Sequence, residues 1–151
     1  MKKSILFFGL ITAFAACTSK TESHSSTSTS STTVTHSDGT TETVSSSIST
    51  VDAGTFKSQM ESAPGTVLDV RTAEEVAEGH LANSINIDIN GSDFESKINE
   101  LDKQAPVYVY CRSGGRSARA ADILKANGFS TIVNLDGGIT AWTQAGNETV
   151  K

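Results

Sequence analysis

From about Ile48 onward, short apolar runs alternate with segments in which apolar residues recur every three or four positions. Apolar runs bounded by polar, Gly or Pro positions predict buried strands, and the three-to-four spacing predicts helices that bury one face. The expected strands are 48–50, 66–70, 84–87, 107–110 and 131–134. The expected helices are 52–62, 73–78, 94–101, 115–126 and 137–144. This alternation predicts one three-layer α/β domain over residues 48–151, with a central parallel sheet flanked by helices.

Within this domain, the segment 115–126 has the pattern of a helix with a narrow apolar face. Ala118, Ala121 and Leu124 recur at helical spacing, so they are the expected buried face. Gly128 is typical of a helix C-terminal stop. The apolar run 107–110 that precedes this helix predicts the central strand of the sheet.

The first sixteen residues have the composition of an export signal. Lys2 and Lys3 precede an apolar stretch over 5–16, which is too short to span a bilayer. Cys17 follows two small residues, as in a bacterial lipobox, although Phe14 stands where an aliphatic residue is commoner. We therefore expect a lipoprotein signal peptide over residues 1–16 and a lipid on Cys17. An ordinary signal peptide and a retained anchor are the alternatives.

Each of these alternatives predicts export. The lipobox interpretation further predicts a protein of the cell envelope that is lipid-anchored to a membrane, on its periplasmic or surface face.

Residues 17–47 are dominated by Ser and Thr and contain almost no apolar side chains. Such a segment cannot bury enough surface to offset the entropy of ordering it, so a flexible tether is expected. Asp38 and Gly39 suit a hairpin turn, but the apolar alternation around them is thin, and a stable hairpin is not expected. His24 and His36 are expected to be solvated.

Charge narrows the class of ligand. The chain has 12 Lys and Arg against 17 Asp and Glu, a net charge of -5, which becomes -7 if Lys2 and Lys3 leave with the signal peptide. An acidic chain of this kind is not expected to bind nucleic acid. Positive side chains are nevertheless concentrated in one short segment, which contains Arg112, Arg116 and Arg119 and follows Cys111. A positive pocket on an acidic body suits a small anionic substrate.

Cys111 ends the central strand and opens a glycine-rich loop before the helix at 115–126. Such a loop directs backbone N–H groups and the positive end of the helix dipole at the sulfur, which favours the thiolate. With Cys17 lipidated, Cys111 would be the remaining thiol of an exported protein, and the sequence has no set of residues with metal-ligand spacing. The pattern therefore predicts a nucleophile at the carboxyl end of a strand, where open α/β sheets bind ligands.

Three blocks of the sequence resemble the rhodanese family of sulfurtransferases. They are 69–87, with its Asp69-Val70-Arg71 and Glu78-Gly79-His80-Leu81 segments, then 111–117, and finally 134–142. The blocks occur in the family's order and together span roughly 48–143. Asn83 stands where a Gly is usual and Asp88 where a Pro is common. Both departures concern the shape of the connection after His80 rather than the chemistry.

The resemblance implies that Cys111 takes the outer sulfur of thiosulfate or a related small anionic donor, expelling sulfite. Cys111 would then hold the sulfur as a persulfide for a thiol or cyanide acceptor. No metal or organic cofactor is expected, and a monomer is expected. The residues expected to bind the donor are Arg112, Ser113, Gly114, Gly115, Arg116 and Arg71. The residues expected to have structural roles near the site are Asp69, His80 and Ser117.

Arg71 has a second interpretation, in which its pairing with Asp69 fixes the end of the strand. Two other functions also stay open at this point. A carrier would display its persulfide to a partner without efficient turnover. Phosphatases and arsenate reductases related to this family have one more residue in the loop than the four between Cys111 and Arg116. The shorter loop therefore favours sulfur chemistry.

Overall fold

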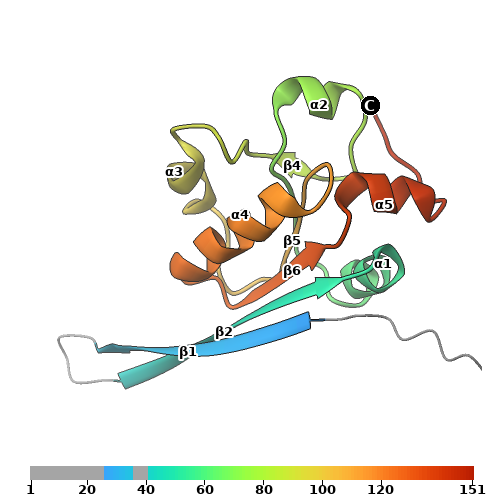
Figure 1. The fold of residues 1–151 in the computed structure, drawn as a ribbon. Helices are drawn as coiled ribbons and strands as arrows, with labels where there is room; N and C mark the ends of the chain where they lie inside the picture. The colour runs from blue at the N-terminus through green and yellow to red at the C-terminus, as the bar shows by residue number, and fades with distance from the viewer. Residues whose placement is uncertain (1–25, 36–40) are drawn as a thin grey trace, which may run out of the picture.

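The computed structural model describes residues 26–35 and 41–151, which contain a six-stranded sheet in the order β1-β2-β6-β5-β3-β4 (Figure 1). The strands are β1 (Ser26–Thr35), β2 (Thr41–Val51), β3 (Thr66–Asp69), β4 (Ile85–Asn86), β5 (Val107–Tyr110) and β6 (Thr131–Leu135). All neighbouring strands run parallel except β1 and β2, which are antiparallel. The expected central parallel sheet is thus present, with one antiparallel strand added at its edge.

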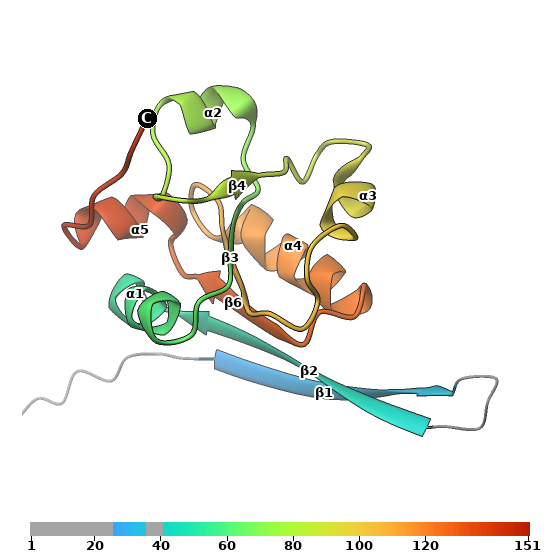
Figure 2. The ribbon, with the colours of Figure 1, turned by 180° about the vertical axis from the view of Figure 1, so that it is seen from behind.

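Five helices lie in the described ranges and cover both faces of the sheet (Figures 1 and 2). They are α1 (Ala53–Ser62), α2 (Ala73–Ala77), α3 (Phe94–Ile98), α4 (Gly115–Ala126) and α5 (Gly138–Gln144). One buried cluster includes Phe94 of α3 and Leu124 of α4, and a second includes Phe56 of α1 and Trp142 of α5. The three-layer α/β architecture predicted from the alternation of strands and helices is confirmed.

The start of α1 shows how the sequence sets a helix boundary. Asp52 is its N-cap, and the Asp52 carboxylate accepts the Thr55 N–H at 2.9 Å, which satisfies a backbone donor that the helix leaves free. The helix then runs to Ser62, where the sequence predicts its end.

The buried face of α4 differs from the predicted one at Ala118. The structure buries Ser117, Ala120, Ala121 and Leu124, whereas Ala118 is exposed. Burial therefore recurs at spacings of three and four from Ser117, which faces the cysteine loop. The prediction followed apolar residues and so missed a buried polar residue at the head of the helix.

The prediction of a flexible tether over residues 17–47 does not hold for 26–35 and 41–47, which lie in strands β1 and β2. The C-terminal part of β2 pairs with β6 from Ser47 to Val51, so β1 adds to a strand that the sheet already holds. An isolated hairpin would lack this support. The β-branched Thr residues also suit extended backbone. Residues 1–25 and 36–40, which include Cys17, lie outside the described residues.

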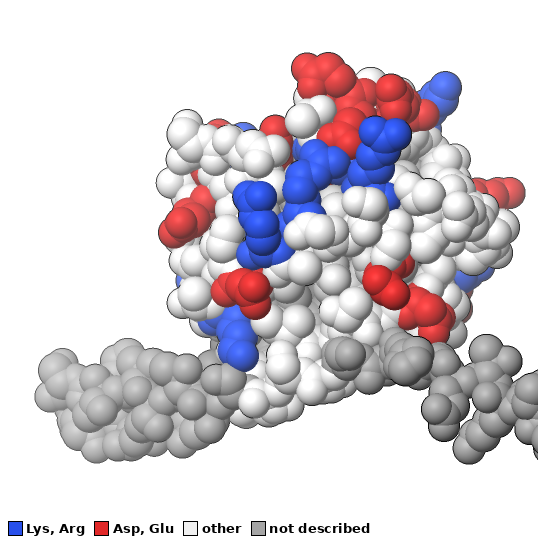
Figure 3. All heavy atoms as spheres, viewed as in Figure 1, with Lys and Arg blue, Asp and Glu red and all other residues white. Residues whose placement is uncertain are grey.

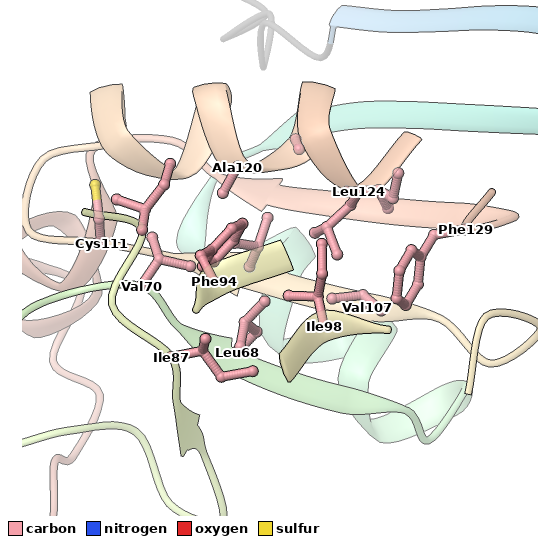
Figure 4. Close-up of a cluster of buried hydrophobic side chains, with 14 of the residues drawn as sticks. Leu68, Val70, Ile87, Phe94, Ile98, Val107, Cys111, Ala120, Leu124 and Phe129 are labelled. Carbon is pink, nitrogen blue, oxygen red and sulfur yellow. The ribbon is translucent and has the colours of Figure 1, made fainter. Parts of the chain in front are cut away.

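Strand β5 is buried along its whole length and leads directly to Cys111. Figure 4 shows Cys111 at one end of a buried cluster that continues through Val70 and Phe94 toward Phe129. The packed core thus holds Cys111 in place, and with it the start of the loop that follows. Across 26–35 and 41–151, none of the helices has the length and apolar character needed to cross a membrane.

Candidate active site

The backbone after β5 wraps around the sulfur of Cys111. The Gly114 N–H donates to Cys111 Sγ at 3.1 Å, and the Ser117 hydroxyl lies 3.5 Å from the same sulfur. Gly114 is the N-cap of α4 and has a φ of 96°, a left-handed conformation that glycine adopts without strain. This conformation turns the chain from the strand into the helix while its N–H points at the sulfur.

These contacts set the ionisation of the thiol. Burial raises the pKa of Cys111, but hydrogen bonds from the Ser117 hydroxyl and from three backbone N–H groups outweigh it, so the pKa lies below its ordinary value. The Ser117 hydroxyl also lies 3.0 Å from the Gly114 carbonyl oxygen. Because a hydroxyl has one hydrogen, it donates to either the carbonyl or the sulfur, and a negative charge on sulfur favours the second.

The outer side of the loop is held by the first turn of α5. The Ile139 N–H donates to the Cys111 carbonyl oxygen at 2.9 Å, and the Thr140 hydroxyl donates to the Arg112 carbonyl oxygen at 2.9 Å. A Cβ on Gly138 would overlap the Cys111 carbonyl oxygen, so this close approach needs glycine. The Cys111 and Arg112 carbonyl oxygens are thus bound by α5, whereas the Ser113 and Gly114 N–H groups are directed at the sulfur.

Arg116 forms an ion pair that the sequence did not indicate. Its two terminal guanidinium nitrogens donate to the two carboxylate oxygens of Glu75, each at 2.7 Å. Hydrogen bonding from Arg116 lowers the pKa of Glu75 to about 2, and the bond to Glu75 likewise raises the pKa of Arg116. The expected donor-binding residue is therefore a fixed cation beside the thiol, tethered to α2.

Asp69 and Arg71 form a buried pair at the end of β3. Arg71 Nη2 lies 2.6 Å from the Asp69 carboxylate, and the two side chains are 4 % and 0 % exposed. The remaining Arg71 donors bind the Glu75 and Gly79 carbonyl oxygens at 3.1 and 2.8 Å. This geometry favours the interpretation in which Arg71 fixes the end of the strand over one in which it binds the donor.

His80 lies in a network of polar groups that reaches the Tyr110 hydroxyl of β5. Its Nδ1 is 2.9 Å from the Leu81 carbonyl oxygen and 3.1 Å from the Ser84 hydroxyl, which in turn accepts the Tyr110 hydroxyl. Burial is the main cause that raises the pKa of Tyr110 to about 12. The ring of His80 is thus held by Leu81 and Ser84, and its expected structural role stays a prediction.

The remaining candidate residues of the loop face outward. Arg112 and Ser113 are exposed, and so is Arg119 on α4. Figure 3 shows basic side chains running from the loop along α4, with acidic side chains gathered beside them over α2. Arg112 also lines a cavity of about 240 Å³ between α2 and α5. The site therefore presents opposite charges on its two sides.

Sequence reasoning missed the functional positions of Glu75 and Thr140. A signal for Glu75 exists in part, because Thr72 and Glu75 have the spacing of a capping box, and the structure forms that box at the start of α2. That spacing places Glu75 on the first turn of a helix but says nothing of Arg116, 41 residues away. No local pattern indicates the bond from Thr140 to Arg112.

Replacing Ser117 by Ala is expected to raise the pKa of Cys111 by about one unit, because a hydrogen bond to a charged group contributes about 1.5 kcal/mol. The measurement is the rate of alkylation by iodoacetamide against pH, since alkylation follows the thiolate. The wild-type midpoint should lie below the value of about 8.5 for a free thiol, and Ser117→Ala should move it upward. Ser113→Ala, which keeps the backbone N–H, is the control. Identical midpoints in all three proteins would contradict the account of the thiol.

Replacing Glu75 by Gln is expected to remove about 2 kcal/mol of stability near pH 7, through loss of the charged hydrogen bonds to Arg116. A carboxylate with a depressed pKa contributes stability that is complete above its unfolded pKa of about 4.3 and declines as the pH falls towards 2. Urea unfolding from pH 7 to pH 2 should therefore show a steeper loss for wild type than for Glu75→Gln. The exposed neighbour gives the control, Glu74→Gln. Parallel pH profiles for wild type and Glu75→Gln would show that the pair contributes nothing.

The sequence profile of the rhodanese-like domain matches residues 52–145. The chain is 34% identical over 80 residues to a protein of Allochromatium vinosum described as a sulfurtransferase, which covers 53% of this chain and 73% of that one. It is 39% identical over 77 residues to the thiosulfate sulfurtransferase GlpE of Pseudomonas fluorescens, covering 50% and 68% of the two chains.

A third relative is YrkF of Bacillus subtilis, described only provisionally as a sulfur carrier protein. It is 33% identical over 99 residues, which is 65% of this chain and 52% of YrkF. The match to YqhL of the same organism covers 59% of that protein, so the chain spans little more than half the length of these two relatives. The crystal structure of a rhodanese-related protein from Thermoplasma volcanium is similar with a TM-score of 0.60 and 36% identity, covering 67% of this chain and 96% of that one.

Proposed function

Because the chain belongs to the rhodanese-like family and resembles its sulfurtransferases, we propose that it transfers sulfane sulfur through Cys111. The donor is thiosulfate or a related small anion, and the acceptor is a nucleophile such as cyanide or a thiol. The observation that carries this proposal is the sulfur of Cys111 at the end of β5, held 3.1 Å from the Gly114 N–H and with a lowered pKa.

The chemistry divides into two displacements. In the first, the Cys111 thiolate attacks the outer sulfur of thiosulfate, the sulfur–sulfur bond of thiosulfate breaks, and sulfite leaves with the bonding electron pair. The loop N–H groups that stabilise the thiolate also stabilise the persulfide anion, since both species place negative charge next to the same hydrogen-bond donors. In the second, the acceptor attacks the outer sulfur of the persulfide and Cys111 departs as a thiolate.

The negative charge of the proposed donor fits the two arginine side chains of the loop. Arg116 is held beside the thiol by Glu75, and Arg112 is exposed at the rim. Guanidinium groups bind oxyanions through paired hydrogen bonds, so these residues are suited to the negative oxygens of the donor. In this proposal, Arg116 contributes mainly a fixed positive charge that attracts the donor, and Arg112 contacts the anion directly.

The experiment is a steady-state assay of the purified protein with thiosulfate and cyanide, in which thiocyanate is measured. Turnover with an apparent affinity that weakens as salt is added would support a charged donor site. Persulfide formation on Cys111 without turnover would instead favour the carrier, the second candidate that the similarity to YrkF supports. Absence of both turnover and persulfide with thiosulfate would remove thiosulfate as the donor.

We also propose that Cys17 carries the lipid that anchors the protein to a membrane, since it follows a charged and then apolar N-terminal stretch. The expected result is recovery of wild type with membranes and lipid mass on Cys17, whereas Cys17→Ala should lose that association. The protein fragment starting at Ile48 should retain wild-type turnover if it folds, which its circular dichroism would report. Wild type recovered without lipid and cleaved elsewhere would contradict the anchor while leaving the sulfurtransferase proposal intact.

A further inference from the structure

The cavity between α2 and α5 adjoins the cysteine loop through three of its lining residues. Arg112 directly follows Cys111, and the Thr140 hydroxyl binds the Arg112 carbonyl oxygen at 2.9 Å. Glu75 binds Arg116, whose charge interacts with the Cys111 thiolate. A molecule in this cavity would therefore lie beside the sulfur-carrying loop.

Two of the charged groups on the cavity wall are already engaged. The guanidinium of Arg71 binds Asp69 and two carbonyl oxygens, and both carboxylate oxygens of Glu75 bind Arg116. Their charges are therefore neutralised within the protein, and they have little capacity left for a ligand.

Arg112 and Glu78 are the other charged residues on this wall. Both are exposed, and within residues 26–35 and 41–151 neither has a side-chain ion pair or hydrogen bond. One is a cation and the other an anion. The charges that the cavity offers to a ligand are therefore one of each sign.

We propose that this cavity binds the sulfur acceptor, and that the acceptor is a small thiol carrying both a carboxylate and an ammonium group, as a free amino acid thiol does. Arg112 binds the carboxylate and Glu78 binds the ammonium. The volume of about 240 Å³ is below the range of drug-sized ligand pockets, which suits a molecule the size of one amino acid. This inference rests on the proposed function, because it names the acceptor of the Cys111 persulfide.

The transfer step is balanced without an added oxidant or reductant. The acceptor thiolate attacks the outer sulfur of the Cys111 persulfide and forms a new sulfur–sulfur bond. The old sulfur–sulfur bond breaks, and its electron pair stays on Cys111 as the thiolate. If the acceptor enters as a thiol, its proton passes to water or to the terminal sulfur of the product.

Four small thiols with different sets of charged groups test this assignment. Cysteine has both groups, cysteamine lacks the carboxylate, 3-mercaptopropionate lacks the ammonium, and 2-mercaptoethanol lacks both. The full chain is first loaded with thiosulfate, and the second-order rate of persulfide discharge is measured for each thiol and corrected for its thiolate fraction. Cysteine should react faster than 2-mercaptoethanol by about tenfold, the size expected of two partly exposed ion pairs.

The variants separate the two contacts. Arg112→Gln should erase the advantage of cysteine over cysteamine, and Glu78→Gln should erase its advantage over 3-mercaptopropionate. The matched control is Glu74→Gln, since Glu74 is an exposed glutamate of α2, the helix that Glu78 caps at its C-terminus, and it does not line the cavity. Equal corrected rates for the four thiols, or the same effect from Glu74→Gln as from Glu78→Gln, would overturn the proposal.

A binding measurement separates this proposal from the one on which it rests. S-Methylcysteine keeps both charged groups but cannot accept sulfur, and its binding to unloaded protein can be followed by calorimetry. We expect Arg112→Gln and Glu78→Gln each to weaken this binding by about threefold to tenfold. If thiosulfate does not load Cys111 but this binding is seen, the proposed function is wrong and the cavity assignment stands. If loading occurs and S-methylcysteine does not bind, the cavity assignment alone is wrong.

Discussion

Replacing Cys111 by Ser is expected to lower thiocyanate formation from thiosulfate and cyanide by at least about 10⁴-fold, the scale on which loss of a covalent nucleophile acts. A serine oxygen would accept the same hydrogen bonds as the sulfur does, including the one from the Gly114 N–H. However, a hydroxyl remains protonated at neutral pH and does not take up sulfur as a thiolate does when it forms a persulfide. The loss should therefore appear in turnover and not in the fold.

Thermal unfolding of Cys111→Ser supplies the control, because the variant should unfold near the wild-type temperature. The residue lies at the end of a packed cluster, and serine is close to cysteine in size (Figure 4). If Cys111→Ser keeps turnover comparable to wild type, the nucleophile lies elsewhere and the proposed mechanism is wrong.

Replacing Asp69 by Asn is expected to lower the free energy of unfolding by about 3 to 5 kcal/mol, because it leaves a buried guanidinium without a counter-charge. Asp69 and Arg71 are 0% and 4% exposed, so water cannot replace the lost partner. Urea unfolding at pH 7 measures the effect.

Two comparisons identify the cause of that loss. Asp93→Asn breaks the pair with Lys97, whose side chains are more than half exposed, and should leave stability nearly unchanged. The double variant Asp69→Leu/Arg71→Met removes both charges and should be less destabilised than Asp69→Asn. If Asp69→Asn costs no more than Asp93→Asn, the pair does not hold the end of β3.

Much of the fold follows from local patterns that the sequence carries openly. Asp52 caps α1 where the sequence predicts it, and the run 107–110 is the buried strand that precedes the thiol. Two local predictions were incomplete for physical reasons. Ala118 is exposed because Ser117 takes the buried position beside the sulfur. The Ser/Thr segment forms β1 and part of β2 because β6 supplies a strand to pair with, and no local composition reveals that partner.

The sequence predicts only the part of the candidate site whose residues are adjacent in the chain. The loop from Cys111 to Arg116 is one such segment, and its glycines and N–H groups lie where the pattern indicates. The supporting contacts come from residues distant in the chain, namely Glu75 on α2 and Thr140 on α5. Such pairings depend on how helices pack across the sheet, which a single sequence does not specify.

The most direct test of the central claim is the intact mass of the protein after incubation with thiosulfate and removal of excess donor. We predict that wild type gains the mass of one sulfur atom, that peptide mapping places the sulfur on Cys111, and that cyanide removes it with release of thiocyanate. The Cys111→Ser protein should gain nothing. Thiocyanate formation by wild type without any sulfur adduct on Cys111, at any donor concentration, would contradict transfer through a Cys111 persulfide.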